Sequence, residues 1–481
     1  MTDAPAAQAV ADDAGESLAK VIPWIVACAL LMQNLDSTAV TTAVPVMARS
    51  LGVAPIKLSA AVTSYILAVA TFLPASGWAA DRFGARSVFA AAIALFTCAS
   101  IACGATNDLT WLVVARIVQG IGGSMMVPVG RLVLIRSVPR AQLISAMART
   151  TAPALIGPAL GPLVGGFLTT YWSWRWIFYV NVPIGVVGIG LVLALIPNFK
   201  EAPDVVGRFD GAGFVISGVA LAASVFALEA VSRPDLTRLT IAAAFATAFV
   251  FSLAYLRHAR RTPNPVLDPS LFAFPAFRAG VAGGSFFRLG AGALPFLMPM
   301  LLQIGFGLSA IESGSITFSA ALGAMISKSF ARPLLRRFGF RTVLSLNGWA
   351  SGIILAGFAL FRPSTPHMVI VAALFAGGML RSIQFTSMNS VTYADVPASL
   401  TSRANTLANV AQQLSISIGV ATAAVALHVT QMAHGTPSLQ PLDFTPAFLV
   451  IGLASWASGI AFSRLGRDVG TEMSGHVARA R

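Results

Sequence analysis

Residues 31–45 read Leu-Met-Gln-Asn-Leu-Asp-Ser-Thr-Ala-Val-Thr-Thr-Ala-Val-Pro and place a carboxylate, that of Asp36, inside a long apolar segment. Counted back from Pro45, Asp36 lies roughly 13 Å inside the far end of a helix. An ionisable group in a membrane span is costly, so it normally faces a cavity and serves function. The alternative is an Asp tolerated near the interface, which suits a shallower position. The depth favours a functional carboxylate, with Gln33 and Asn34 beside it in a cavity.

The composition of the whole chain is that of an integral membrane protein. Of its 481 residues 56% are hydrophobic and only 10% are charged, and the mean hydropathy is +0.78. A soluble fold cannot bury so much apolar surface, whereas a bilayer can. The net charge of +14 would suggest nucleic acid in a soluble protein, but the arginines stand in short clusters between apolar spans. We therefore predict the lipid bilayer, and no nucleic acid, as a partner.

The apolar pattern predicts about fourteen membrane-spanning helices of roughly twenty residues each. Basic residues concentrate in every second connection, which predicts that both termini are cytoplasmic in a multi-pass protein of the cell inner membrane. The cysteines Cys28, Cys98 and Cys103 have no metal-ligand spacing, so we expect no metal site. The expected spans are 21–46, 59–79, 88–106, 110–134, 142–168, 176–196, 211–230, 238–256, 277–302, 311–331, 342–361, 367–391, 402–428 and 445–464.

An internal repeat divides the chain into related halves. Asp-Arg-Phe-Gly-Ala-Arg-Ser-Val at 81–88 recurs as Arg-Arg-Phe-Gly-Phe-Arg-Thr-Val at 336–343, each between the second and third spans of its half. Two related bundles with a site at their interface are typical of a secondary transporter. We predict an all-α integral membrane fold of two six-helix bundles with an inserted pair. The expected parts are a disordered tail 1–20, an N-terminal bundle 21–196, an inserted pair with linkers 197–276, a C-terminal bundle 277–465 and a tail 466–481.

Four motifs carry a family resemblance that covers nearly the whole chain. They are the first-helix stretch 35–45, the loop 77–86, the fourth-helix stretch 116–123 and the glycine-rich stretch 157–166. Together they resemble the major facilitator superfamily, in its fourteen-helix drug:proton antiporter branch. The resemblance implies a monomeric, proton-coupled exporter of drugs or other small organic molecules that works by alternating access, with the proton gradient as driving force and no cofactor. Stretches 31–38, 73–78 and 125–132 resemble bacterial exporters for which export of organic acids or citrate is also proposed.

The loop motif predicts a cytoplasmic gate. Asp81 with Arg82 and Arg86 can form charge pairs that latch the two bundles and must break for the site to face inward. Plain membrane topology is the alternative, and it explains the arginines but not Asp81 or the glycines Gly77 and Gly84. The second copy of the repeat has Arg in place of the Asp, so we do not extend the gate to the C-terminal half.

The fourth-helix motif predicts a partner for the buried carboxylate. Arg116 and Gln119 lie on one stripe of the helix, and Arg116 is roughly 9 Å from its outer end, near the depth of Asp36. A buried guanidinium favours an ionised Asp, so protonation of Asp36 would be coupled to substrate release. The alternative is a structural ion pair that never titrates. The coupling role also needs an aqueous path to Asp36.

The glycine-rich stretch predicts a hinge on the fifth span. Glycines four residues apart fall on one face and allow another helix to approach closely, while prolines remove hydrogen bonds and favour a bend. Close packing alone could also require the glycines. The predicted hinge residues are Gly157, Pro158, Gly161, Pro162, Gly165 and Gly166.

The C-terminal half carries buried cations and no mid-membrane carboxylate. Arg288 and Arg381 lie roughly 15 Å from the inner face, and Gln384 follows one turn later. Two arginines could clamp a carboxylate or phosphate of the substrate. The alternative is hydrogen bonding to backbone carbonyls between helices. We place all three residues in the substrate cavity, together with Gln33, Asn34, Asp36 and Gln119 of the N-terminal half.

Two other classes of function were weighed against transport. An intramembrane enzyme needs a positioned nucleophile and base or a metal site, yet the sequence has neither His-Glu-x-x-His nor Gly-x-Ser-x-Gly. A receptor or scaffold would normally add a soluble sensory domain, and no loop is long enough to form one. The sequence therefore favours a transporter without enzymatic activity.

Overall fold

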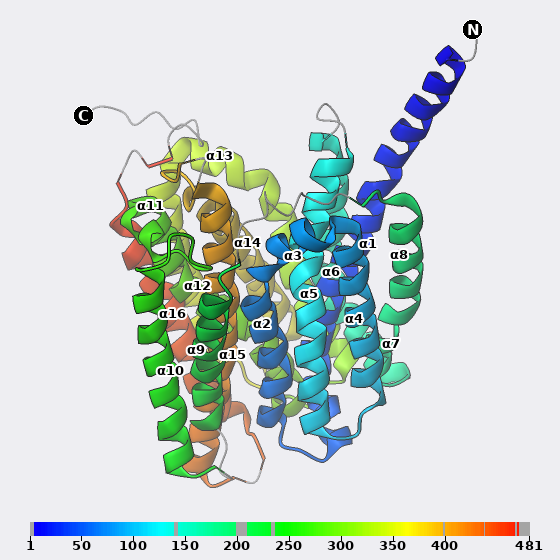
Figure 1. Cartoon of the computed structure of the whole chain (residues 1–481). Coiled ribbons are helices and arrows are strands. Elements are labelled where there is room, and N and C mark those ends of the chain that lie inside the picture. Colours follow the sequence, from blue (N-terminus) through cyan, green and yellow to red (C-terminus); the bar gives the residue numbers. More distant parts are fainter. Residues whose placement is uncertain are drawn as a thin grey trace.

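The computed structural model describes residues 4–138, 143–198, 209–231, 236–397, 400–436, 438–466 and 469–470, with the backbone alone for 4–20, 143–145, 147–149, 151–156, 159 and 332. Within these ranges the structure consists of helices and short turns and has no strand, which confirms the predicted all-α fold. Helices from distant parts of the sequence stand side by side as two bundles (Figure 1).

Among the described residues, the first bundle and the inserted pair account for ten α-helices, and the second bundle adds six. The first contains α1 (Ala4–Leu51), α2 (Ser59–Phe72), α3 (Ala75–Phe83), α4 (Ala85–Ala105), α5 (Leu109–Ser137), α6 (Leu143–Tyr171), α7 (Trp176–Tyr179) and α8 (Asn181–Leu195). The inserted pair is α9 (Gly211–Val231) and α10 (Arg238–Ala259). The second bundle contains α11 (Pro275–Arg278), α12 (Gly284–Met300), α13 (Ala310–Gly357), α14 (His367–Val391), α15 (Thr401–His434) and α16 (Phe444–Ser463).

Twelve helical stretches among the described residues are long and apolar enough to cross a membrane. Two further predicted spans, the fifth and the tenth, correspond to α6 and to the first part of α13. The multi-pass architecture therefore follows the hydropathy pattern, although the count of fourteen rests partly on these two.

Two segments differ from the expected boundaries. The sequence predicts a disordered tail over 1–20, whereas α1 begins at Ala4; the alanine-rich composition of this segment has high helix propensity, which explains the difference. The segment between 331 and 342, predicted as an inner loop, is also helical. Within α13 the helical backbone is interrupted at Gly339, whose positive φ of 71° is a conformation that glycine adopts readily.

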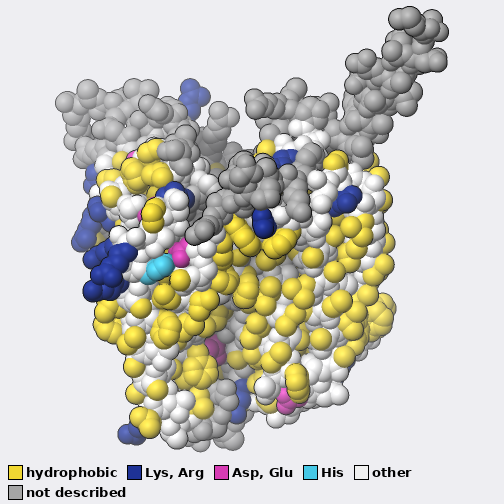
Figure 2. Space-filling view, viewed as in Figure 1, with side chains coloured by type: hydrophobic (Ala, Val, Ile, Leu, Met, Phe, Trp, Pro, Cys, Tyr) yellow, Lys and Arg dark blue, Asp and Glu magenta, His cyan; other side chains and the backbone are white. Residues whose placement is uncertain are grey.

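The two ends of the bundles differ in charge. The arginine-rich face is the end where α5 and α10 finish, with Arg136, Arg257 and Arg260, and the arginine-poor face is the end where α1 finishes and α2 begins. Figure 2 shows Lys and Arg side chains gathered near the upper end of α10, above a broad band of apolar side chains. This pattern suits a molecule embedded in a bilayer.

Apolar packing joins the bundles at the arginine-poor face. One buried cluster there combines residues of both, for example Val44 and Ala61 with Met298 and Leu427. Toward the arginine-rich face, the described clusters divide into one within the first bundle and others that lie in the second bundle and α10. The structure is therefore a conformation that is closed at the arginine-poor face.

Candidate functional site

The centre of the first bundle holds a buried ion pair. Arg116 Nη1 on α5 donates to Asp36 Oδ2 on α1 at 2.6 Å, and the side chains are 1% and 0% exposed. The structure thus brings together the two residues to which the sequence assigns proton coupling. Two charges buried in a membrane span require each other, because either alone would carry a large desolvation cost.

Amide side chains complete the shell of the carboxylate. Gln119 Nε2 and Asn181 Nδ2 each donate to Asp36 Oδ1 at 3.0 Å, and Gln119 Nε2 also lies 2.8 Å from Ser100 Oγ. Asn181, on α8, and Ser100, on α4, were missed in the sequence. An amide at the start of an otherwise apolar span is a signal that could have found Asn181. Four helices therefore contribute polar groups to one site.

Arg116 also links this site to α2. Its Nη1 donates to Gln119 Oε1 at 2.6 Å, and its Nε donates to the carbonyl oxygen of Ala61 at 3.2 Å. The guanidinium carbon lies 4.2 Å from the ring centre of Tyr65, in cation–π geometry. Asp36 is fully enclosed, so the aqueous path that the coupling role needs is closed in this conformation.

The polar neighbours of Asp36 on α1 make other contacts. Asn34 Nδ2 donates to the carbonyl of Leu30 at 2.8 Å on its own helix, and Asn34 Cβ lies against Gly157 of α6. Gln33 is half-buried, and its Oε1 has no partner among the described residues. Asn34 is thus used in helix packing.

The glycine-rich stretch lets α6 approach both α1 and the opposite bundle. A Cβ on Gly165 would lie 2.7 Å from the carbonyl oxygen of Ala39, and one on Gly161 would overlap Thr38. A Cβ on Gly166 would lie 2.5 Å from the carbonyl oxygen of Ala310 on α13. The helix that carries the predicted hinge therefore lies at the interface between the bundles.

The loop motif forms an ion pair with the end of α5. Asp81 Oδ1 accepts from Arg136 Nη2 at 2.9 Å, and both residues belong to the first bundle. Arg82 is exposed, and Gly84 has a φ of 93°, which favours glycine at this turn. The described ion pair of Asp81 thus joins the loop to α5 within the first bundle, and the latch between the bundles stays a prediction.

Arg288 is a buried cation in the second bundle. Its side chain is 2% exposed, and Nη2 donates to Asn389 Oδ1 at 3.2 Å. Its Nε and Nη1 are buried without a hydrogen-bond partner among the described residues. Burial raises the pKa of the Tyr393 phenol, and the nearby guanidinium groups of Arg288 and of Arg131 on α5 act to lower it.

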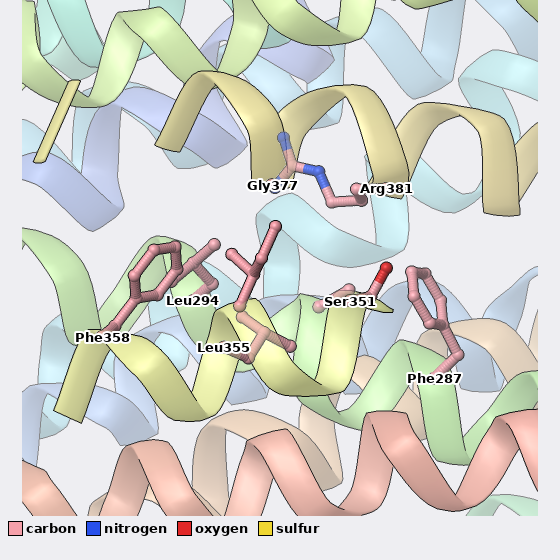
Figure 3. A pocket seen from close by; sticks show the side chains of 9 residues that line it. Phe287, Leu294, Ser351, Leu355, Phe358, Gly377 and Arg381 are labelled. Atoms are coloured by element: carbon pink, nitrogen blue, oxygen red, sulfur yellow. The ribbon is translucent and has the colours of Figure 1, made fainter. Parts of the chain in front are cut away.

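Arg381 and Gln384 have separate surroundings. Arg381 lines a small cavity between α13 and α14 with Phe287, Ser351 and Leu355, and lies across it from Ser351 and Leu355 (Figure 3). Gln384 is 0% exposed: its Oε1 accepts from Asn347 at 2.9 Å and its Nε2 donates to the carbonyl of Leu344 at 3.1 Å. The placement of Gln384 in the substrate cavity is therefore corrected, because helix–helix contacts use both ends of its amide.

This fold and site define a class: a two-bundle membrane transporter with a charged pair at its centre. A family model of the Major Facilitator Superfamily matches residues 26–420. The chain belongs to this superfamily and is a secondary transporter. Among the described residues, no group of three or more His, Cys, Asp or Glu is placed to hold a metal ion.

Relatives with similar sequences carry a multidrug-resistance name. The chain is 41% identical to MdtD of Escherichia coli strain K12 over 411 residues, which cover 85% of this chain and 87% of that protein. It is 40% identical to MdtD of Salmonella paratyphi B with the same coverage. Among solved structures, a D-xylose–proton symporter aligns with a TM-score of 0.68 at 14% identity, over 93% of this chain and 98% of that one. A POT peptide transporter aligns with a TM-score of 0.66 at 14% identity, over 92% and 93%. These structures support the fold alone.

Proposed function

We propose that this protein is a proton-coupled exporter of drugs or other small organic molecules. The multidrug-resistance names of its relatives support the substrate class. The arginine-rich face is cytoplasmic, with both termini, in the cell inner membrane. The protein works as a monomer, because the path for substrate lies between its own two bundles.

The buried Asp36–Arg116 pair is the observation that carries this proposal. When Asp36 accepts a proton, the pair loses its ionic attraction, and Arg116 keeps Gln119 and the Ala61 carbonyl as acceptors. The helices α1, α2 and α5 can then change their relative positions. The proton leaves Asp36 on the other side of the membrane when the opposite conformation reopens, so the inward movement of protons drives export.

The closed arginine-poor face indicates which state of the transport cycle the structure represents: the one in which the outer side is sealed. Apolar contacts of both bundles seal that face, and Asp36 lies enclosed beneath them. Loading a proton from outside therefore requires the interface at this face to open, as alternating access demands. The glycines of α6 lie at the interface and act as its hinge, with Pro158 and Pro162 weakening the helix locally. Asp81 and Arg136 hold the inner loop against α5 while the cytoplasmic side is open.

A second candidate is export of organic anions such as citrate or a metal–citrate complex. One specific observation favours it: Arg288 is buried with two nitrogens lacking partners among the described residues. A buried guanidinium in this state stabilises a carboxylate well. Arg381 lines a cavity nearby, together with Phe287 of the helix that carries Arg288. In this account Arg288 binds the substrate and Asp36 carries the proton.

Counterflow in proteoliposomes tests both candidates at once. Purified protein is reconstituted with either tetraphenylphosphonium or citrate inside, and uptake of the labelled compound is followed with and without an imposed pH gradient. A drug exporter exchanges the lipophilic cation and accumulates it when the gradient is applied, whereas an anion exporter does so with citrate. Exchange of neither compound, or exchange that no pH gradient can drive uphill, would contradict proton-coupled export of these classes.

A further inference from the structure

The first turns of α2 contact three separate parts of the molecule. The carbonyl of Ala61 accepts from Arg116 of the proton site at 3.2 Å. The carbonyl of Thr63 lies 3.5 Å from Ser417 Oγ on α15, in the opposite bundle. The hydroxyl of Thr63 donates to Glu229 Oε1 on the inserted helix α9 at 2.9 Å. A movement of this short segment therefore reaches the proton site, the second bundle and the inserted pair together.

Glu229 anchors α9 at this point. Its carboxylate is 8% exposed, and its second oxygen accepts from Ser59 Oγ at 2.9 Å. A buried carboxylate is stable only when its oxygens accept hydrogen bonds, so these hydroxyls fix the end of α9 on α2. An acidic residue at the membrane interface would instead face water. The side chain of Glu229 thus lies in the protein interior.

The rest of α9 lies against both bundles. Phe214 packs edge-on against Phe72 of α2, with ring centres 5.5 Å apart. Ile216 and Leu221 of the same helix pack against a cluster that contains residues of α15 such as Leu407. These contacts lie in the half of α9 nearer the arginine-rich face. The helix therefore bridges the bundles: this half packs against α15, and Glu229 holds the opposite end on α2 near the arginine-poor face.

We propose that α9 is a brace that holds the arginine-poor face closed, with Glu229 as its positioning residue, and that α2 links this brace to the Asp36–Arg116 pair. The inference deepens the proposed function and rests on it for the direction of coupling. Opening separates α2 from α15, so α9, which contacts both, must release one of them. Thr63 makes the release on α2 easy, because its hydroxyl also lies 3.0 Å from the carbonyl of Ser59 and can return to its own helix.

Distances between spin labels at the arginine-poor face test the brace. The native cysteines are replaced, and labels are placed at the exposed positions Ala54, before α2, and Met432, near the end of α15. In Glu229→Leu the ratio of long to short distances should rise roughly tenfold, the change expected from losing hydrogen bonds to a charged group. Unchanged distances in a folded Glu229→Leu protein would overturn the proposal.

Milder variants and a matched control protect this test from a folding defect. Thr63→Val keeps the shape of the side chain and should shift the ratio in the same direction but less. Glu229→Gln retains one acceptor and should restore part of the wild-type distribution. Glu312→Gln is the control, because Glu312 is an exposed capping residue on the same face and Gln can replace Glu in a capping box. A shift in this control equal to that of Glu229→Leu would overturn the specific role of Glu229.

The link to the proton site is tested by a double-mutant cycle on the same distances. The effect of Glu229→Leu should differ at least about threefold between the wild-type and Asp36→Asn backgrounds, because coupled sites are not additive. Equal effects would overturn the link through α2. The distance measurement needs no substrate, so it is independent of the transport assay. If only the brace proposal is wrong, Glu229→Leu leaves the distances unchanged while pH-driven transport still depends on Asp36. If only the proton mechanism is wrong, transport does not depend on Asp36 while Glu229→Leu still changes the distances.

Discussion

The two bundles bury charge in opposite ways. In the first, Asp36 is enclosed with Arg116, Gln119 and Asn181 around it, and each oxygen of the carboxylate accepts a hydrogen bond. In the second, Arg288 is equally buried, yet two of its nitrogens lack partners among the described residues. A satisfied charge is held by the protein itself, whereas an unsatisfied one costs stability until a ligand arrives. On this difference we base the proposal that the first bundle carries the proton and, in the anion-export candidate, that Arg288 of the second bundle binds the substrate.

The largest expected effect is on the satisfied pair. Asp36→Asn leaves Arg116 as a buried charge without its counter-ion, so the protein should lose about 3 kcal/mol of stability. Thermal unfolding in detergent measures the loss. The double variant Asp36→Asn with Arg116→Met removes the orphaned charge and should recover most of the stability; an equally unstable double variant would contradict the assignment.

A second substitution examines the packing that holds the Asp36 helix in place. Gly165→Ala puts a methyl group within 2.7 Å of the Ala39 carbonyl on α1, so α6 and α1 must move apart. Overpacking of this kind should cost about 2 kcal/mol and slow transport. Gly77→Ala is the matched control, because a Cβ there meets nothing within 4 Å. Similar melting temperatures for the two variants would show that the close approach of α6 is not needed.

The unsatisfied charge should respond in the opposite direction. Arg288→Leu removes a guanidinium whose nitrogens are unpaired and should leave stability unchanged or raise it by about 1 kcal/mol. The same variant should lose transport of anions while that of lipophilic cations persists. Arg278→Leu, an exposed arginine on the same segment, serves as the control. A strongly destabilised Arg288→Leu would mean that the cation already has a structural partner, and the comparison between bundles would fail.

The smallest effect concerns the exposed pair of the loop motif. Asp81 and Arg136 are 37% and 21% exposed, so Asp81→Asn should cost no more than about 0.5 kcal/mol. High salt should have a similar effect in the wild-type protein. The expected change is in the balance between conformations, which is read from the rate of exchange at saturating substrate. If Asp81→Asn lost as much stability as Asp36→Asn, burial would not be the reason why the two ion pairs differ in their contribution to stability.

Much of the fold was predictable because membrane spans have a strong apolar signal. The connections between the spans have no such signal, so their structure was predicted less well. The first and last spans of each bundle lie near the predicted residues, while α13 continues through a region predicted as a loop. The arginines in this region are compatible both with an inner loop and with the end of a helix, so the sequence could not distinguish the two. The single glycine break at Gly339 was visible only in the backbone.

The site was predictable where motif spacing and depth agree. Asp36 and Arg116 meet because both lie near the same depth, whereas Asn181 comes from a distant helix without any local spacing signal. Gln384 shares a face with Arg381 by spacing, yet Asn347 on a neighbouring helix captures its amide. Periodicity gives the face of a helix but not which neighbour covers that face, so tertiary packing was needed.

Transport driven by pH in proteoliposomes tests the central claim most directly. Wild-type protein and Asp36→Asn are reconstituted at equal amounts, and both exchange of labelled substrate without a gradient and accumulation with a gradient are measured. The account predicts that the wild-type protein accumulates substrate against its concentration, while Asp36→Asn exchanges substrate but no longer accumulates it. Accumulation by Asp36→Asn at the wild-type level would contradict the role of Asp36 as the proton carrier.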